Sequence, residues 1–188
     1  VDEIFPFLMG RTDLVLQAVS DDAIAKSCDV AFSCLPHHEA MTHVAAWVKK
    51  GLKVIDLSAD FRFRDAATYN EWYPSAHSAP ELARSAVYGL PELHRDEIRS
   101  ANLVGNPGCY STASILALAP IVRERLIDPE YCIIDAMSGA SGAGRSNFSL
   151  DYHYAEANES VTPYKAGGTH RHTPEIEQEL EALWERTG

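Results

Sequence analysis

The chain has 188 residues, of which 46% are hydrophobic, so it can build a core for one domain or for two small ones. Its formal net charge of −11 argues against nucleic acid as a partner, because phosphates attract surfaces rich in Lys and Arg. No apolar run reaches the roughly 18 residues of a membrane-spanning helix, and we expect no membrane partner either.

A strand, a helix and a second strand are predicted near the amino terminus. The run CDVAFSCLP, residues 28–36, has small and β-branched apolar residues between polar stops, which is typical of a buried strand. Residues 37–51 carry apolar side chains at helical spacing, with two lysines and a glycine at the end. LKVIDLSADF, residues 52–61, predicts the next strand. Such a unit indicates a parallel sheet and an α/β fold.

Further elements are predicted between residues 62 and 168. Residues 62–100 are polar, aromatic and rich in proline, which predicts short helices and loops without a strand. Residues 102–108 predict a short strand and a turn, and residues 111–126 predict a helix that Pro120 kinks. YCIIDAMSG, residues 131–139, predicts a last strand, and glycine-rich loops follow it.

Cys109 lies in the stretch NPGCYST, where the short strand meets the start of a helix. Unpaired N–H groups and the positive end of the helix dipole favour the thiolate there, which is the nucleophilic form. The alternative is a buried structural cysteine. Cys28, Cys34 and Cys132 lie in strand-like runs, where we expect burial. No two cysteines form a CxxC pair, which favours a reducing, cytoplasmic compartment.

His170 and His172 precede the last predicted helix, in which Thr173 is the expected N-cap and Pro174 the first residue. Either imidazole could exchange a proton with a thiol, because its ordinary pKa lies near neutrality. A metal site is an alternative for the H-x-H spacing, but no cluster of cysteines or carboxylates completes it. A loop histidine without chemistry is the other alternative.

Five stretches together resemble the N-acetyl-gamma-glutamyl-phosphate reductases. They are KVIDLSADFR, VYGLPEL, GNPGCYST, IIDAMSGASGAGR and YKAGGTHRHTPEIEQ, and the similarity runs from about residue 4 to residue 182. Each stretch is weak alone, whereas their order and spacing are specific. The family's Gly-rich dinucleotide loop and its closing segment are missing, so we expect a fragment. Ser111 stands where many members have proline, in a first helical turn that accepts both residues.

The resemblance implies a truncated Rossmann-type NADP-binding domain at residues 1–107 and the first part of an α+β catalytic and dimerisation domain at residues 108–188. It implies NADPH-dependent reduction of N-acetyl-glutamyl 5-phosphate to N-acetyl-glutamate 5-semialdehyde plus phosphate, in arginine biosynthesis. Cys109 would form a thioester, which accepts hydride where a carboxylate would not. His170, favoured mildly over His172, would carry the proton. The complete protein would be a cytoplasmic homo-oligomer, a dimer or tetramer.

The resemblance also implies residues that bind substrate and cofactor. Glycine-rich backbone can present N–H groups to phosphate or carboxylate, and cations add charge beside them. The implied substrate residues are Asn106, Arg62, Ser138, Gly139, Ser141, Arg145 and Lys165. The implied NADP(H) residues are Leu35, Pro36 and His37, at the carboxyl end of a strand where such sheets bind ligands, together with Gly142, Ala143 and Gly144. No metal is implied.

Three other functions compete with this one. A related acyl-phosphate reductase could act on an aminoadipyl or aspartyl phosphate, and residues around Arg62 and Lys165 would decide between them. A cysteine hydrolase or acyltransferase could use Cys109 and His170 without a nucleotide, but it would require a complete triad. A non-enzymatic oligomerisation module would have no use for the full set of active-site stretches.

Overall fold

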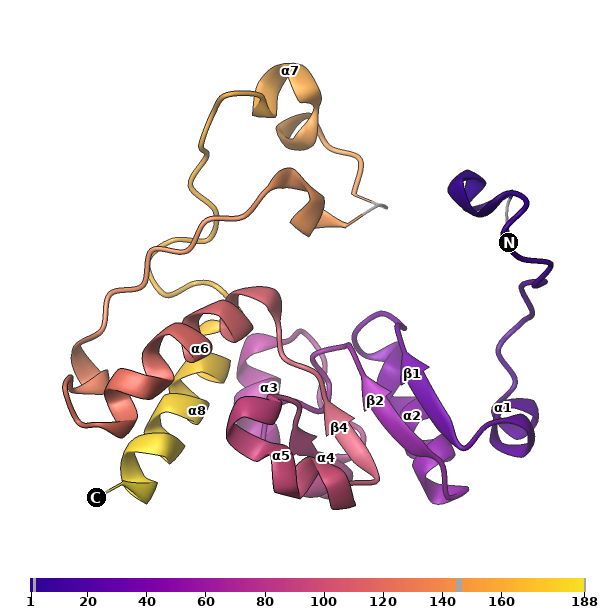
Figure 1. Cartoon of the computed structure of the whole chain (residues 1–188), viewed down its shortest axis with the longest axis horizontal. Helices are drawn as coiled ribbons and strands as arrows, with labels where there is room; N and C mark the ends of the chain where they lie inside the picture. Colours follow the sequence, from indigo (N-terminus) through magenta and orange to yellow (C-terminus); the bar gives the residue numbers. More distant parts are fainter. Residues whose placement is uncertain (2, 145–146, 188) are drawn as a thin grey trace.

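A computed structural model describes residues 1, 3–144 and 147–187 of the chain. Its sheet has four parallel strands in the order β1-β2-β4-β3 (Figure 1). The strands are β1 (Val30–Ser33), β2 (Lys53–Asp56), β3 (Val87–Tyr88) and β4 (Leu103–Gly105). The parallel sheet and the α/β class predicted from the sequence are therefore confirmed.

The central strands β2 and β4 are the more buried part of the sheet. Val54, Asp56 and Leu103 have almost no exposed surface, whereas Phe32 on the edge strand β1 is 69% exposed. β4 ends on Gly105, where a β-carbon would collide with the backbone carbonyl of Phe61. Only glycine lets the strand pass so close to the neighbouring loop, and that loop carries Arg62 toward the carboxyl end of the sheet.

Helix α2 (Glu39–Lys49) packs on β2 and forms the first hydrophobic core. Its buried side chains are Ala40, Met41, Val44 and Trp47, which recur at helical spacing as predicted. Gly51, with φ of 90°, follows its carboxyl end. The core also includes aromatic side chains of the loop after β2 and of the short helix behind it: Phe61, Phe63, Tyr69 and Tyr73.

Four shorter helices surround the sheet. They are α1 (Asp21–Ser27), α3 (Ala66–Trp72), α4 (Pro80–Ser85) and α5 (Pro91–Ser100). The short helices and loops predicted for residues 62–100 are thus confirmed. The prediction that this stretch contains no strand was wrong, because β3 pairs with β4 at the sheet edge. A strand of two residues is too short to leave an alternating pattern in the sequence.

Helices α6 (Cys109–Arg123) and α8 (Thr173–Arg186) lie side by side in parallel. Ala119, Val122, Leu180 and Leu183 form the core between them. At their carboxyl ends, the Arg125 guanidinium donates a hydrogen bond of 3.0 Å to the Trp184 carbonyl. Because the two helices run in the same direction, their amino-terminal ends also meet, and this brings together two segments about 60 residues apart in the sequence.

The helix boundaries differ slightly from the prediction. α6 begins at Cys109, two residues before the predicted start, so the cysteine is the first helical residue. α8 begins at Thr173 with His172 as its N-cap, whereas the sequence favoured Thr173 as the cap. Both shifts are within the usual uncertainty of a helix end.

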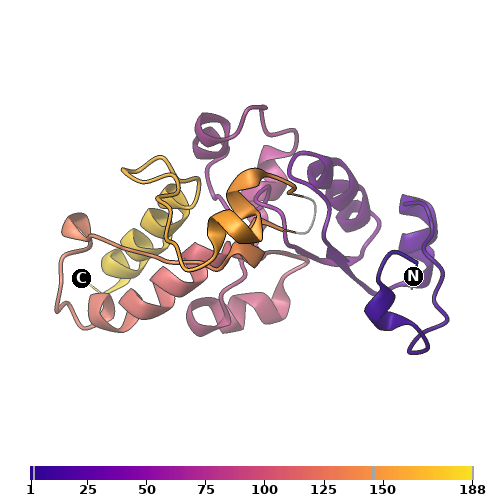
Figure 2. The ribbon, with the colours of Figure 1, turned by 90° about the horizontal axis from the view of Figure 1, so that it is seen from above.

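The segment between α6 and α8 rises away from the sheet and returns to it, as Figures 1 and 2 show in orange. Within the described part it contains only short helices: η2 (Pro129–Tyr131), η3 (Ala140–Ala143), η4 (Leu150–Tyr152) and α7 (Tyr154–Ala157). The strand predicted at residues 131–139 is wrong for this structure, because these residues pair with no strand in the described sheet and Ile133 is fully exposed.

The amino-terminal segment before α1 contains a short helix, η1 (Pro6–Leu8), and it too exposes apolar side chains such as Leu14 and Val15. The expected burial of three cysteines was also wrong: Cys28 and Cys34 are exposed and Cys132 is half-buried. Cys28 and Cys34 flank an edge strand, where apolar residues are not covered on both faces. In the described residues, no helix is long and apolar enough to cross a membrane.

Candidate active site

Cys109 is exposed on the first residue of α6, directly after the buried turn residues Pro107 and Gly108. β4 ends at Gly105, so the cysteine lies at the carboxyl edge of the sheet, four residues beyond the strand. The N–H groups of the first helical turn have no partners within the helix, and the helix dipole adds positive potential there. The local structure therefore suits an oxygen that gains negative charge beside the sulfur.

His172 packs its ring against the turn before Cys109. A β-carbon on Gly108 would overlap the Cε1 and Nε2 atoms of this ring, so glycine is required for the approach. The Nδ1 atom of His172 is buried and has no hydrogen-bond partner in the described residues. Burial, Arg62, His170 and Arg171 lower the pKa of His172 to about 3. The imidazole is therefore neutral at physiological pH.

His170 lies beside His172, with ring centroids 4.6 Å apart. Its ring makes edge contacts with Tyr110, at 5.1 Å, and with Tyr164, at 5.4 Å. Its Nδ1 atom accepts a hydrogen bond of 3.0 Å from the backbone N–H of His172. Burial, followed by the charges of Lys165 and Arg171, lowers the pKa of His170. The two predicted histidines and the turn of the predicted cysteine thus come together.

A buried carboxylate that the sequence interpretation did not select supports the same turn. Glu175, in the first turn of α8, has no exposed surface. Its Oε1 accepts hydrogen bonds from the N–H of Gly108, at 2.9 Å, and from the hydroxyl of Tyr88, at 2.7 Å. This burial raises the pKa of Tyr88, because the phenolate would face the carboxylate. The only signal for Glu175 in the sequence is a carboxylate three residues after the H-x-H pair.

Arg62 is part of this support and not a free cation. Its side chain is 6% exposed and lies 3.4 Å from Glu175. It also donates to the carbonyl oxygens of Asn106, at 2.7 Å, and Leu57, at 3.0 Å. Each of its three nitrogens therefore donates a hydrogen bond to another group of the protein. Asn106 is half-buried and its side chain donates to the Pro107 carbonyl.

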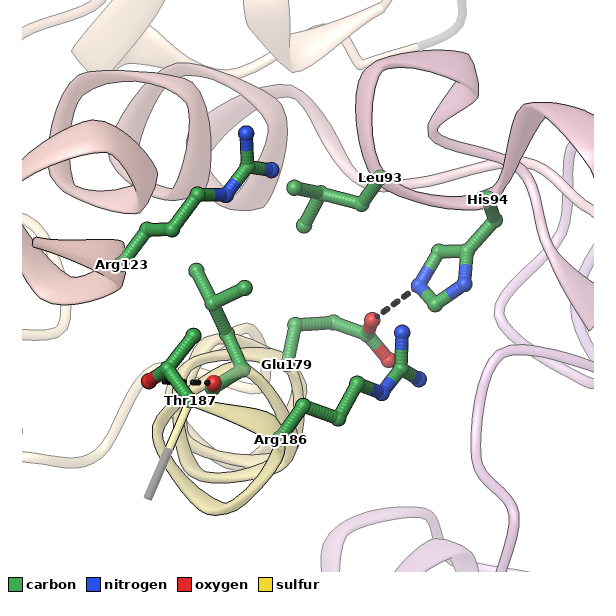
Figure 3. A pocket seen from close by; sticks show the side chains of 7 residues that line it. Leu93, His94, Arg123, Glu179, Arg186 and Thr187 are labelled. Atoms are coloured by element: carbon green, nitrogen blue, oxygen red, sulfur yellow. Dashed lines mark hydrogen bonds and ion pairs between the residues drawn. The ribbon is translucent and has the colours of Figure 1, made fainter.

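A second buried carboxylate, Glu179, fastens α8 to the sheet domain one turn further along. It accepts a hydrogen bond of 2.7 Å from Arg64. It also faces His94 of α5 at 2.7 Å, as the close-up in Figure 3 shows. The other ring nitrogen of His94 lies 2.6 Å from Glu97. A carboxylate faces each ring nitrogen, which favours the protonated ring, and the hydrogen bond to Glu179 is the largest cause that raises the pKa of His94.

The cavity drawn in Figure 3 is not the candidate active site. Its volume is about 230 Å³, and its lining includes Leu93, His94, Arg123, Arg186 and Thr187. The last three of these lie at the carboxyl ends of α6 and α8, opposite to the ends that carry the cysteine and the histidines. A helix of 15 residues separates the two ends by roughly 22 Å.

The loop after β1 lies at the same edge of the sheet as the cysteine. Leu35 is half-buried and Pro36 is exposed. The Nδ1 of His37 accepts from the N–H of Ala59 at 2.9 Å, and burial together with the charge of Arg171 lowers the pKa of His37. Arg171 lies over the ring of Tyr73 at 5.1 Å. The charges that lower the pKa values of His37 and His172 thus include the same guanidinium.

The start of α2 is already occupied by a carboxylate. Asp60 accepts hydrogen bonds from the N–H groups of His38, at 2.8 Å, and Met41, at 3.2 Å, and from the Tyr69 hydroxyl at 2.8 Å. With Asp60 on two of its N–H groups, this helix start offers fewer donors to a pyrophosphate. If this edge of the sheet binds a dinucleotide, the residues at the strand ends would face its nicotinamide end and not its pyrophosphate.

The glycine-rich stretch lies in the excursion, which is the segment of residues 124–172 between α6 and α8. Its members on and beside η3 are exposed apart from the half-buried Ala143: Ser138, Gly139, Ser141, Gly142 and Gly144. Lys165 is exposed as well, with its Nζ 5.9 Å from the ring centroid of Tyr164. Arg145 lies outside the described residues. In the described residues, no three His, Cys, Asp or Glu side chains could jointly hold a metal ion.

Comparison with known proteins finds two family models along the chain. The model "Semialdehyde dehydrogenase, NAD binding domain" matches residues 1–101, and "Semialdehyde dehydrogenase, dimerisation domain" matches residues 109–187. A curated relative from Syntrophobacter fumaroxidans, an N-acetyl-gamma-glutamyl-phosphate reductase, is 52% identical over 183 residues, which cover 97% of this chain and 52% of the relative.

Further relatives give the same result. The N-acetyl-gamma-glutamyl-phosphate reductases of Symbiobacterium thermophilum and Moorella thermoacetica are each 51% identical over 180 residues, covering 96% of this chain and 51% of each relative. The chain thus spans about half the length of the curated relatives it matches. The range matched by the dimerisation-domain model, residues 109–187, contains Cys109, His170 and His172.

Proposed function

This chain belongs to the semialdehyde dehydrogenase family, and we propose that it is part of an N-acetyl-gamma-glutamyl-phosphate reductase. Such an enzyme reduces N-acetyl-glutamyl 5-phosphate to N-acetyl-glutamate 5-semialdehyde and phosphate in arginine biosynthesis. The observation that carries the proposal is the exposed Cys109 on the first residue of α6, with the ring of His172 packed on the residue before it. The names of the relatives support this substrate.

In the first step, the sulfur of Cys109 attacks the acyl carbon of the substrate. A C–S bond forms, the C–O bond to phosphate breaks, and phosphate leaves with the electron pair. The thiol proton passes to an imidazole of the pair His170 and His172. N–H groups in the first turn of α6 stabilise the negative charge that develops on the acyl oxygen.

The charge of the substrate is part of this chemistry. Before substrate binds, both imidazoles are poor bases, because burial and nearby cations lower their pKa values. An acyl phosphate that also carries a carboxylate brings negative charge close to Arg171 and Lys165. This charge offsets the two cations and makes the imidazoles better proton acceptors. Substrate binding and formation of the thiolate are therefore coupled.

NADP(H) is the cofactor of the proposed reaction, and it supplies a hydride to the thioester when it is bound. Leu35, Pro36 and His37 would hold its nicotinamide end at the carboxyl edge of the sheet. The exposed position of Pro36 supports this placement. The glycine-rich residues Gly142, Ala143 and Gly144 stay a proposal for further cofactor contacts.

The expected substrate residues fall into two groups: one residue supports the cysteine turn, and the others are candidates for direct contact with the substrate. We assign Arg62 to the support of the turn, since its three nitrogens hold protein groups. Asn106, beside the cysteine turn, and Lys165, close to His170, stay candidates for substrate contact, and so do residues of the glycine-rich stretch: Ser138, Gly139, Ser141 and Arg145. Of these, Arg145 lies outside the described residues.

We also propose a homo-oligomer, a dimer or tetramer, in the cytoplasm. The description of the matched dimerisation domain supports an assembly, and so do the exposed apolar side chains of the excursion, among them Ile133, Met137 and Phe148. Four free cysteines, two of them exposed beside β1, support a reducing compartment.

Formation of the thioester tests this function without a nucleotide. The 188-residue chain is mixed with N-acetyl-glutamyl phosphate, quenched in acid and digested, and the acylated peptide is identified by mass spectrometry. We expect the acyl group on Cys109 and no acylation in Cys109→Ser. Acylation of Cys28 or Cys34 in place of Cys109, or none at all, would contradict the proposal. Because these two cysteines are exposed, Cys28→Ser and Cys34→Ser serve as matched controls.

Two rival reactions are tested in the same experiment. Aspartyl phosphate and an aminoadipyl phosphate are offered at equal concentration, and faster acylation of Cys109 by either one would identify the related reductase. A nucleotide-independent hydrolase would instead release free acid continuously from the thioester. A stable thioester that is discharged only on addition of NADPH supports the reductase.

A further inference from the structure

His170 uses its inner ring nitrogen to cap the start of α8. Its Nδ1 accepts a hydrogen bond of 3.0 Å from the N–H of His172, the N-cap residue of the helix. Its carbonyl oxygen accepts another, of 2.9 Å, from the N–H of Thr173. Two amide donors at the start of the helix are thus satisfied by one residue.

This contact determines which nitrogen of His170 can carry a proton. A backbone N–H can only donate, so Nδ1 must present its lone pair to it. A neutral imidazole with a bare Nδ1 carries its single hydrogen on Nε2. Protonating Nδ1 would break the cap and would place a positive charge against the positive end of the α8 dipole.

The surroundings of His170 favour the same state. Its ring makes edge contacts with Tyr110 and Tyr164, and turning the ring over to exchange its two nitrogens would break the hydrogen bond to Nδ1. The charged groups that act on it are Lys165 and Arg171, and both disfavour a second proton. Tyr110 follows Cys109 directly in the sequence, so the ring faces the cysteine end of α6.

We propose that His170 carries its proton on Nε2 and acts as a hydrogen-bond donor to the acyl oxygen of the substrate, and not as the base that takes the thiol proton. This inference rests on the proposed acyl-phosphate chemistry. As the C–S bond forms, the acyl oxygen gains negative charge, and a neutral N–H donor stabilises it without transferring its proton. The thiol proton is then left to His172, whose ring packs on Gly108 and becomes a better acceptor once the negative charge of the substrate offsets the nearby cations. This assignment departs from the sequence-based preference for His170.

The tautomer is measured directly by NMR on the 188-residue chain with ¹⁵N-labelled histidine. Two-bond ¹H–¹⁵N correlations at neutral pH distinguish a protonated ring nitrogen from a bare one, and His170→Gln assigns the signals. We expect His170 to have a bare Nδ1 and a protonated Nε2. A protonated Nδ1, alone or in an even mixture, would overturn the inference whether or not the chain forms a thioester.

Two substitutions separate donation from capping. The side-chain oxygen of Asn in His170→Asn can replace Nδ1 as the cap, whereas the amide of Gln in His170→Gln can replace the Nε2 donor. We expect thioester formation to slow about 10²–10³-fold in His170→Asn, the usual loss of one oxyanion donor, and less than about 10-fold in His170→Gln. The pH dependence of the rate should stay the same in His170→Gln, because no titrating group is lost.

Each other pattern contradicts the inference. If His170 were the base, both variants would lose about 10²–10⁴-fold, because neither amide accepts a proton. If it only capped the helix, His170→Asn would keep its rate and His170→Gln would lose it. A wild-type chain that forms no thioester would refute the proposed function, and the NMR measurement would still decide the tautomer.

Discussion

Two neutral imidazoles beside a thiol make this site depend on the charges around them. Burial is the largest cause of the low pKa values of His170 and His172, and cations from different parts of the chain add to it. Arg171, between the two histidines in sequence, acts on both. It also acts on His37 across the sheet edge. A single guanidinium thus links the loop after β1 to the start of α8.

Removing this guanidinium tests the link. In Arg171→Gln we expect the pKa of His172 to rise from about 3 and the pKa of His170 to rise with it, while both stay below the ordinary value because burial remains. An NMR titration of the histidine rings measures both values. Arg99→Gln, which changes an exposed arginine on α5, is the matched control. Unchanged histidine titrations in Arg171→Gln would refute the link.

Gly108 is needed because the ring of His172 lies against it, and not because its own backbone conformation requires glycine. Gly108 has φ of −68°, which any residue adopts, so Gly108→Ala introduces only the collision with His172. We expect it to lower the free energy of unfolding by about 1–3 kcal/mol, the usual cost of overpacking. The double variant Gly108→Ala with His172→Ala removes the collision.

Urea unfolding of the four proteins in this cycle gives the coupling between the two positions. The alanine at position 108 should cost little when the ring at position 172 is absent. An equal cost in both backgrounds would show that the ring does not explain the glycine.

At the scale of elements, buried charged groups join α8 to the loop after β2 and to α5. Glu175 and Glu179 are four residues apart and so lie on one face of the helix. They face Arg62 in one turn and Arg64 with His94 in the next. The apolar face, with Leu180 and Leu183, packs on α6. The helix that follows the two histidines is therefore held on two sides.

Removing the first carboxylate should loosen this helix. In Glu175→Ala we expect a loss of about 3–5 kcal/mol in the free energy of unfolding, because Arg62 is left buried without its partner. Urea unfolding with an unchanged m-value measures it. Glu177→Ala, on the exposed side of the same helix, should stay within about 0.5 kcal/mol of wild type. Equal effects of the two substitutions would contradict the buried role of Glu175.

The second contact should make stability depend on pH. The folded state raises the pKa of His94 above its ordinary value of 6.5, mainly through Glu179. Its stabilising contribution is therefore complete below pH 6.5 and is lost as the pH rises through the folded value. We expect the difference in unfolding free energy between wild type and His94→Gln to shrink from pH 6 to pH 9. A constant difference would show that the ring does not titrate in this range.

At the scale of the whole molecule, most apolar residues left uncovered lie in two segments far apart in the sequence. One precedes α1 and includes Leu14 and Val15; the other is the excursion, with Ile133 and Phe148. The chain spans about half the length of the curated relatives it matches. Many exposed apolar side chains in one segment favour association.

A charge placed in the excursion should weaken this association. Ile133 is fully exposed, so Ile133→Lys should leave the free energy of unfolding unchanged while it reduces self-association of the chain. Sedimentation velocity over a concentration series measures the effect. Ala67→Lys adds the same charge to the exposed surface of α3 and is the control. Equal sedimentation of the two variants would exclude the excursion as the contact surface.

Local patterns in the sequence were sufficient for much of the fold. The strand–helix–strand unit, the helix that follows Cys109 and the helix that opens after His172 were all predicted, because apolar spacing, prolines and glycines act over a few residues. The cysteine and the two histidines could be selected from residue type and position. The strand predicted at residues 131–139 failed, because its apolar pattern needs a partner that the described structure does not supply.

The tertiary structure alone decided how these residues cooperate. The parallel packing of α6 on α8 brings His172 onto Gly108, and it buries Glu175 below a turn 67 residues earlier in the chain. It also joins Arg62, which the sequence offered as a substrate cation, to Glu175 and to the Asn106 carbonyl at this turn. Pairings of this kind depend on contacts between distant segments, and a carboxylate on a helix gives the same local signal whether it meets water or a buried arginine.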